Sequence, residues 1–353
     1  MDNKRYILND TLLVFKNEQG LVLSLPEENS FVIDQNIDAF IFLLNQFFLP
    51  NSFEQAFENA IDNGIDFKDV EEETQCFLIK ENLIKSFFVP KEIETSLTNK
   101  QLTKYDRQIR HFSSKNGQNF KTAIRMQESI CQAHVMIIGV GGIGSYLSSG
   151  LALLGVKELT LIDFDNIELS NTSRQILYTE NDLGKDKLSV AKQKLLDYNP
   201  ELKINCYNIN IKDETSLESV STDGVSMLSL CADKPLLEIH YIIDSFCQKR
   251  NIPWIMGGPF SQGRVSLGPI IIPRKTASYT DMVKKSHIID DDISRINSRR
   301  ISAIIDSDNS LAAKMQEVEI IKYLTKYQEV SVLGKQFIID TATWNIEEIC
   351  LCD

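Results

Sequence analysis

The sequence predicts an α/β protein in which a Rossmann-like nucleotide-binding domain follows a small winged-helix-like domain. An apolar run from Val135 to Ile138 leads into a glycine loop that ends at Gly144. Four consecutive apolar residues are typical of a strand buried on both faces. Glycines let the backbone turn sharply and approach a phosphate at the N-terminus of the next helix. The loop therefore predicts a nucleotide site, although a tight strand-to-helix turn without a ligand would leave the same pattern.

A second apolar run, from Leu159 to Ile162, ends at an aspartate. Asp163 lies 19 residues beyond Gly144. This is close to the spacing of about 20 residues at which an acidic side chain ending the second strand accepts hydrogen bonds from a ribose. Dinucleotide dehydrogenases share this feature, so the glycines and the aspartate leave an NAD-dependent dehydrogenase open.

The chain beyond the second strand carries further polar residues. They are Asp163, Asp165, Asn171, Arg174 and Gln175, then Lys187 and, after another apolar run, Asp233. With the glycine loop, this run resembles the ThiF/MoeB/E1-like adenylating enzymes. That superfamily includes the activators of thiamin and molybdopterin sulfur carriers and the microcin C7 adenylating enzyme. The resemblance implies the E1/ThiF adenylation fold, with ATP and Mg²⁺ as cofactors.

The resemblance also implies roles for these residues. Charge builds on the α-phosphate and the pyrophosphate as they separate, and fixed cations such as Arg174 and Lys187 can meet it. A dehydrogenase has no evident need for both. Asp233 matches a Mg²⁺ ligand; by itself it would more simply be a helix N-cap, because Pro235 suits an early helical position. The predicted nucleotide-binding residues are Gly139, Gly141, Gly142, Gly144, Asp163, Asp165, Asn171, Arg174, Gln175 and Lys187.

Composition excludes several classes of function. The formal net charge of −12 over 353 residues argues against a nucleic-acid binder, because phosphate contacts need clustered Lys and Arg. The sequence contains no run of about 18 apolar residues and no signal-peptide core, so we expect a cytoplasmic protein that does not associate with a membrane. Its seven cysteines stand mostly in apolar segments, which predicts reduced thiols rather than a disulfide framework.

Residues 1–90 predict a separate winged-helix-like module. A hairpin turn around residues 17–20 joins two β-prone runs, Asp34 is a candidate cap for the helix that follows, and two more helical patterns precede an apolar run at 84–89. The module is either an accessory packing domain or a clamp that accepts an extended peptide at its hairpin edge. It is similar to the leader-peptide recognition domain of the microcin C7 enzyme, which implies a ribosomal precursor peptide as partner.

Residues 91–115 predict a linker followed by an arginine-bearing helix. A similar segment in the superfamily supplies an arginine that reaches the nucleotide phosphates across a homodimer, and Arg107 stands at the matching position. The resemblance therefore implies a homodimer with Arg107 acting in trans. Without it, a surface arginine on an amphipathic helix would be the simpler interpretation.

Residues 116–353 predict the adenylation domain, with one departure from its relatives. Most relatives hold a structural zinc with two Cys-x-x-Cys pairs, but here Ser278 and Asp281 replace the first pair, and Cys350 and Cys352 leave too few ligands, so we predict no zinc. Residues 276–300 predict either a mobile crossover loop or a solvated insertion. The four histidines show no metal spacing, and Cys231 is expected to be an inert buried thiol rather than a covalent nucleophile.

The sequence thus predicts ATP-dependent activation of a carboxylate or carboxamide on a ribosomally made precursor peptide, in peptide-antibiotic biosynthesis. The product is left open. It is either a nucleotide-capped peptide, as the resemblance to the microcin C7 enzyme implies, or a ring, as the resemblance to its pantocin A relative implies. One alternative is an adenylyltransferase that activates the C-terminus of a ubiquitin-like sulfur-carrier protein. Another is a non-catalytic nucleotide-binding partner, which the presence of Arg107, Arg174, Lys187 and Asp233 disfavours.

Overall fold

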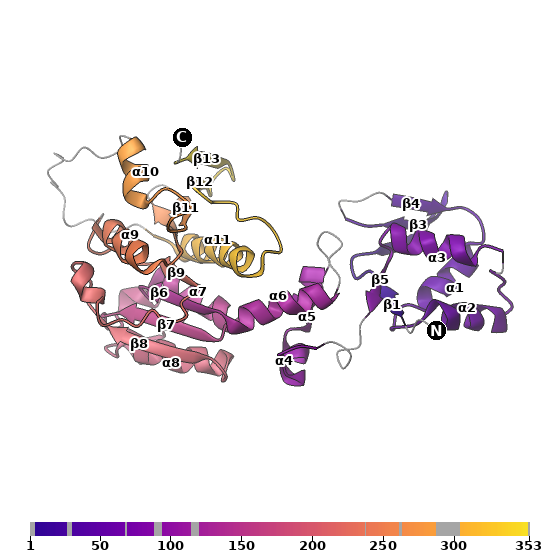
Figure 1. Ribbon diagram of the computed structural model, residues 1–353, viewed down its shortest axis with the longest axis horizontal. Coiled ribbons are helices and arrows are strands. Elements are labelled where there is room, and N and C mark those ends of the chain that lie inside the picture. The colour runs from indigo at the N-terminus through magenta and orange to yellow at the C-terminus, as the bar shows by residue number, and fades with distance from the viewer. Residues whose placement is uncertain are drawn as a thin grey trace. The chain divides into compact units, whose positions relative to one another are not determined.

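A computed structural model describes most of the chain (Figure 1). The described residues are 4–26, 30–67, 69–87, 94–113, 120–236, 238–260, 263–286 and 304–351. The chain divides into two compact units, Met1–Glu128 and Ser129–Asp353. Among the described residues, no helix is both long and apolar enough to cross a bilayer.

The first unit begins with small antiparallel sheets. β2 (Leu13–Asn17), β3 (Gly20–Ser24) and β4 (Ser30–Ile33) form a three-stranded sheet with β3 in the middle. The β2–β3 pair is the hairpin that the sequence predicts, with Asn17 opposite Gly20. β1 (Arg5–Leu8) pairs with β5 (Ile84–Phe87), a pairing of distant segments that the sequence did not indicate. Among the described residues, no further strand pairs with β2 or β4, so both are open edges of the three-stranded sheet.

Three helices complete this N-terminal module: α1 (Ile37–Asn45), α2 (Phe53–Asp62) and α3 (Glu71–Lys80). Their apolar faces and the inner face of the sheet enclose one core. Its fully buried members include Leu21, Leu23, Leu43, Phe47, Ala56, Ala60, Leu78 and Leu83.

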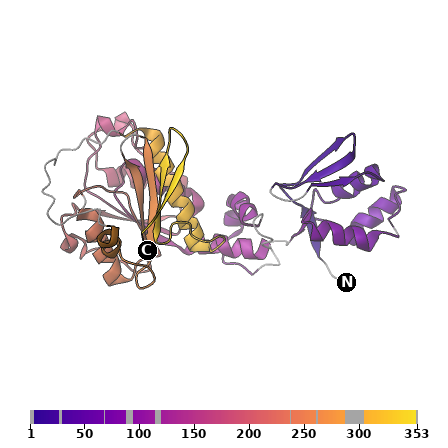
Figure 2. The ribbon, with the colours of Figure 1, turned by 90° about the horizontal axis from the view of Figure 1, so that it is seen from above.

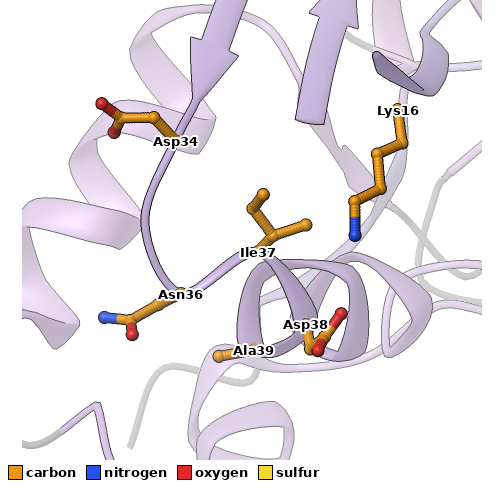
Figure 3. Close-up of a pocket in the computed structure, with 6 residues that line it drawn as sticks. All are labelled: Lys16, Asp34, Asn36, Ile37, Asp38 and Ala39. Atoms are coloured by element: carbon orange, nitrogen blue, oxygen red, sulfur yellow. The ribbon is translucent and has the colours of Figure 1, made fainter. Parts of the chain in front are cut away.

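The predicted cap at Asp34 is wrong. Asn36, in a left-handed conformation with φ 49°, is the N-cap of α1, and no side chain caps this helix. Asp34 instead lines an open hollow with Lys16 and Asp38 (Figure 3). Two residues separate Asp34 from the first helical residue, which is too early for its carboxylate to serve as the cap.

Three helices follow the module: α4 (Asn99–Lys104), α5 (Asp106–Ser113) and α6 (Phe120–Gln132). Thr98 and Gln101 form a capping box at the start of α4, which is the two-way bonding that fixes a helix N-terminus. Residues 91–93 and 114–115 of the predicted linker and helix, and residues 116–119 of the predicted adenylation domain, lie outside the described residues.

The second unit contains one mixed eight-stranded sheet in the order β13-β12-β11-β10-β9-β6-β7-β8. The strands from β8 to β10 pair in parallel, and those from β10 to β13 pair antiparallel. Their bounds are β6 His134–Ile138, β7 Glu158–Asp163, β8 Lys203–Asn208, β9 Met227–Leu230, β10 Trp254–Phe260, β11 Arg264–Ile271, β12 Lys335–Asp340 and β13 Ile346–Cys350. This mixed sheet with its parallel half is the Rossmann-like architecture that the sequence predicts.

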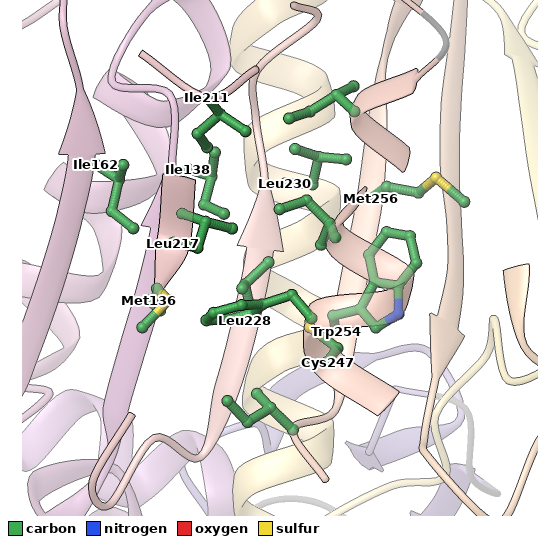
Figure 4. Close-up of a cluster of buried hydrophobic side chains, with 14 of the residues drawn as sticks. Met136, Ile138, Ile162, Ile211, Leu217, Leu228, Leu230, Cys247, Trp254 and Met256 are labelled. Atoms are coloured by element: carbon green, nitrogen blue, oxygen red, sulfur yellow. The ribbon is translucent and has the colours of Figure 1, made fainter. Parts of the chain in front are cut away.

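Helices cover both faces of this sheet. Figure 2 shows the long gold helix α11 on one side of the strands and α9 with α10 on the other. The hydrophobic cluster between the sheet and α9 contains residues of β6, β9 and β10, among them the fully buried Trp254 of β10 (Figure 4). The helices are α7 Gly142–Leu154, α8 Lys187–Tyr198, α9 Glu238–Arg250, α10 Tyr279–Ser286 and α11 Asp306–Thr325, with 3₁₀ turns η2 Leu169–Asn171, η3 Glu180–Asp182 and η4 Glu214–Leu217.

Within residues 276–300, where the sequence predicts a mobile crossover loop or a solvated insertion, Tyr279–Ser286 form the helix α10. The Ser278 hydroxyl donates to the Asp281 carboxylate and accepts from the Asp281 amide, at 2.7 and 3.1 Å. The Thr280 amide and hydroxyl both donate to Asp244 of α9, at 3.2 Å. These bonds start the helix at the position where the resemblance suggested a cysteine pair. Residues 287–300 lie outside the described residues.

Candidate nucleotide site

The glycine loop connects β6 to α7 at the carboxyl edge of the parallel strands. Gly139 has φ 87°, a conformation that favours glycine. A β-carbon there would lie 2.9 Å from the side chain of Ala232. A β-carbon on Gly144 would lie 1.9 Å from the Gly139 carbonyl oxygen. These two glycines are therefore required by the packing of the loop itself, whether or not a phosphate is bound.

Asp163, at the end of β7, holds this loop in place. Its carboxylate is buried and accepts three backbone hydrogen bonds, from Val140 at 2.7 Å, Phe164 at 2.7 Å and Asp165 at 3.0 Å. On the other side, the Tyr178 hydroxyl donates to the Val140 carbonyl at 2.8 Å. Because an ionised carboxylate has about four acceptor positions, Asp163 keeps room for one ribose hydroxyl. Its ribose contact stays a prediction.

Lys187 and Asp165 form an ion pair beside the loop. The Lys187 ammonium lies 2.9 Å from an Asp165 oxygen; the lysine side chain is 6% exposed and the aspartate 48%. Lys187 is also the first residue of α8, whose N-cap is Asp186. A buried ammonium held by a half-exposed carboxylate can exchange that partner for a phosphate at little cost, because the carboxylate can turn to water.

The turn at 168–175 presents three of the predicted residues. The Asn171 side-chain oxygen accepts from the Glu168 amide at 3.1 Å and shapes the 3₁₀ turn η2. Arg174 donates to the Ser170 carbonyl at 2.5 Å, which holds its guanidinium along this turn.

Gln175 reaches from the same turn to the glycine loop. It is 5% exposed, and its Nε2 lies 3.6 Å from the position that a β-carbon on Gly141 would take. Its Oε1 is buried and accepts no hydrogen bond from the described residues. A buried amide oxygen without a donor is uncommon in folded proteins, so Gln175 has hydrogen-bonding capacity left for a ligand at Gly141.

Asp233 lies three residues beyond the end of β9, at the same edge of the sheet. It is exposed and forms no hydrogen bond or ion pair with any other described residue. It does not cap α9, which begins at Glu238. One free carboxylate beside a phosphate site fits Mg²⁺, which binds proteins through one or two carboxylates together with substrate phosphates. The described residues contain no cluster of three or more His, Cys, Asp or Glu that could hold a metal.

The surroundings of Cys231 and His134 indicate structural rather than catalytic roles. Burial raises the pKa of the Cys231 thiol to about 12, so the thiolate needed for covalent catalysis does not form near neutral pH. Burial lowers the pKa of His134, whose ring bonds to Thr160 at 2.8 Å and to the Asp223 carbonyl at 3.1 Å. His287 and Cys352 lie outside the described residues.

Two residues of α11 contribute to this edge and were missed from the sequence. Asn309 packs against Gly142, where a β-carbon would lie 2.4 Å from its side-chain oxygen. Gln316 bonds to Ser229 of β9 and to the Gly257 carbonyl of β10, at 2.7 and 2.9 Å. Two amides seven residues apart lie on one helix face, and this spacing was the available signal.

Arg107 belongs to α5 of the first unit. It is exposed and forms no ion pair or hydrogen bond with a described residue, whereas Arg110 pairs with Asp106 at 3.0 Å and Asp10 at 3.3 Å. The action of Arg107 across a homodimer stays a prediction.

Comparison with known proteins assigns the chain to a family. The sequence pattern of the ThiF family matches residues 105–353. The chain belongs to the ThiF family. Among curated proteins, it is 29% identical over 228 residues to a molybdopterin-synthase adenylyltransferase of Haemophilus influenzae, covering 64% of this chain and 88% of that protein. It is 28% identical over 222 residues to the ubiquitin-like modifier-activating enzyme 5 of Caenorhabditis briggsae, covering 59% of this chain and half of that protein.

Solved structures of ThiF-like proteins match more of the chain. E. coli MccB with ATP superposes with a TM-score of 0.75 at 28% identity, covering 99% of this chain and 97% of MccB. PaaA has a TM-score of 0.73 at 23% identity, covering 98% of this chain and 99% of PaaA, and shows the shared fold. The predicted resemblance to the ThiF/MoeB/E1-like adenylating enzymes is confirmed. This ThiF-family chain is an enzyme of the ATP-dependent adenylyltransferase type.

Proposed function

We propose that this enzyme uses ATP to activate a carboxylate or carboxamide of a ribosomally made precursor peptide that its N-terminal module binds. The observation that carries the proposal is the extent of the structural likeness. The ThiF pattern begins at residue 105, whereas MccB in complex with N-formylated MccA matches 99% of this chain, N-terminal module included, at 26% identity. The module is thus a feature shared with an enzyme of microcin C7 biosynthesis.

The module offers backbone and side chains suited to an extended peptide. β2 and β4 are open edges, whose unpaired amides and carbonyls can take another strand. Leu13, Phe15 and Val32 are 60%, 49% and 46% exposed, so both edges also present apolar side chains. A peptide added at either edge would gain backbone hydrogen bonds for affinity and apolar contacts for specificity.

In the proposed reaction, an oxygen of the peptide carboxylate attacks the α-phosphorus of ATP. The bond from that phosphorus to the bridging oxygen breaks, pyrophosphate leaves with the electron pair, and an acyl-adenylate remains. Backbone amides around Gly141 would bind the phosphates, and Lys187 with Arg174 would stabilise the developing charge. Asp163 would accept from the ribose. Mg²⁺, when held by Asp233, would supply further neutralisation of the phosphates.

The acyl-adenylate is an activated acid, and two outcomes remain within the proposal. A nucleophile of the same peptide could close a ring, or the nucleotide could stay attached as a cap. Arg107 acting from the second copy of a homodimer belongs to the same proposal.

The test is product analysis with ATP, Mg²⁺ and short peptides encoded beside the gene. The enzyme should release pyrophosphate only with its peptide, and Asp233→Ala should abolish release. Phe15→Glu and Val32→Glu place a charge at each open edge. We expect one of them to raise the peptide KM at least tenfold while ATP binding is unchanged. Formation of ADP instead would assign phosphorylation of the carboxylate.

A second candidate is the activation of a ubiquitin-like sulfur carrier. It is favoured by the likeness to the molybdopterin-synthase adenylyltransferase of Haemophilus influenzae. Pyrophosphate release with a sulfur-carrier protein, unchanged by charges at both edges of the module, would select this function over peptide modification.

A further inference from the structure

α11 buries polar side chains on the face that packs against α7 and β10. Asn309 and Gln316 on this face are 3% and 0% exposed, while Ala312 and Ala313 between them keep the helix close to its neighbours. Burying an amide is unfavourable unless its donors and acceptors are paired. The contacts of these amides therefore indicate what the helix holds in place.

Gln316 joins two neighbouring strands. Its Oε1 accepts from the Ser229 hydroxyl of β9 at 2.7 Å, and its Nε2 donates to the Gly257 carbonyl of β10 at 2.9 Å. Both contacts lie toward the carboxyl ends of these parallel strands, which is the edge where α/β sheets bind ligands. One side chain thus ties β9 to β10 where their parallel pairing ends, beside the candidate nucleotide site.

These contacts lead to the loop that carries Asp233. The Ser229 hydroxyl also contacts the Cys231 sulfur at 3.3 Å, and Asp233 lies two residues further on. Gly257 stands where the pairing of β10 with β11 shifts register, so Gln316 supports β10 at an irregularity. Removing the amide would leave Ser229 and Gly257 without this common partner.

We propose that Gln316 is a positioning residue for adenylation. It holds the ends of β9 and β10, and through Ser229 and Cys231 it fixes the loop from which Asp233 reaches the metal. The inference rests on the proposed role of Asp233 as the Mg²⁺ ligand. Gln316 itself contacts neither metal nor nucleotide; its effect is on where the Asp233 carboxylate lies.

The experiment measures ATP binding to the full chain by calorimetry over a series of Mg²⁺ concentrations. Gln316→Met keeps the length of the side chain and removes both hydrogen bonds. We expect the Mg²⁺ concentration for half-maximal binding to rise about tenfold or more, the usual effect of removing a residue that orients a metal ligand. Ile320→Met, a fully buried position on the same helix without a polar contact, is the matched control and should not change it.

Two further variants keep the test decisive. Ser229→Ala removes one of the bonds with little change of volume, so it should shift the Mg²⁺ dependence in the same direction even if Gln316→Met folds poorly. Because both act through one contact, the double variant should shift it less than the two single shifts combined.

Asp233→Ala separates failure of this inference from failure of the proposed metal site. If Asp233→Ala shifts the Mg²⁺ dependence and Gln316→Met and Ser229→Ala do not, the positioning role is overturned and the metal site stands. An equal shift in Ile320→Met also overturns the positioning role, because the effect would then be one of core packing. If Asp233→Ala has no effect, the metal site fails, and this inference with it. The peptide substrate is absent from the assay, so its identity does not affect the outcome.

Discussion

The carboxylate of Asp163 accepts a 2.7 Å hydrogen bond from the backbone amide of Val140, which ties the end of β7 to the loop that follows β6. Two more backbone amides, those of Phe164 and Asp165, bond to its other oxygen. The residue predicted to bind ribose is therefore also a structural support of the glycine loop, and the two roles can be separated by substitution.

Asp163→Asn should weaken both folding and ATP binding. The asparagine amide turns one acceptor oxygen into a donor that faces a backbone N–H, which leaves a buried group unpaired at a cost of about 1–3 kcal/mol. Denaturant unfolding and ATP titration measure the two effects. Asp186→Asn is the control, because Asp186 caps α8 and asparagine is an equally good N-cap. Equal unfolding free energies for the two variants would contradict the role of Asp163 as a structural support of the glycine loop.

Lys187→Met should reduce pyrophosphate release by roughly 10²–10³-fold, the effect of losing one preorganised charge contact in the transition state. We expect only a small loss of stability, because Asp165, its partner, is half exposed and can be solvated. Lys185→Met is the control. Lys185 forms an ion pair of the same length with Asp182, but its side chain is 55% exposed. A similar loss of turnover in both variants would count against a phosphate contact by Lys187.

Gly142→Ala should lower ATP affinity by displacing the glycine loop, because the new methyl would meet the Asn309 side-chain oxygen at 2.4 Å. Overpacking of this kind typically costs about 1–3 kcal/mol. Shortening the partner should relieve it, so we expect Gly142→Ala/Asn309→Ala to be more stable than the sum of the single effects by at least about 0.5 kcal/mol. Thermal unfolding and ATP titration of all four proteins test this coupling; strict additivity would refute it.

Cys231 should resist alkylation, and Cys231→Ala should still form adenylate. Its pKa of about 12 lies above the ordinary thiol value, so the reactive thiolate stays scarce across pH 7–9 and grows only as the pH approaches 12. Mass spectrometry after iodoacetamide treatment compares it with Cys76 and Cys350, which are exposed. Rapid labelling of Cys231 at pH 8, or loss of adenylation in the alanine variant, would reopen a covalent mechanism.

Local sequence patterns predicted the strands and turns whose formation depends mainly on residues close together in the sequence. The apolar runs at Val135 and Leu159 became β6 and β7 because a strand buried on both faces needs continuous apolar residues. The turn at Asn17–Gly20 became the β2–β3 hairpin. The pairing of β1 with β5 could not be predicted, because it joins residues about 80 positions apart and depends on the closure of the module.

The sequence by itself determined the ThiF-type fold and the places of the glycine loop and of the predicted site residues along the chain, since motif spacing follows from strand and helix lengths. Only the tertiary structure decided how this edge is supported. Asn309 against Gly142, Gln316 between β9 and β10, and α10 in place of a loop arise from contacts between distant segments. The spacing of the two amides indicates a shared helix face, but it does not identify their partners, because these are set by the packing of the whole sheet.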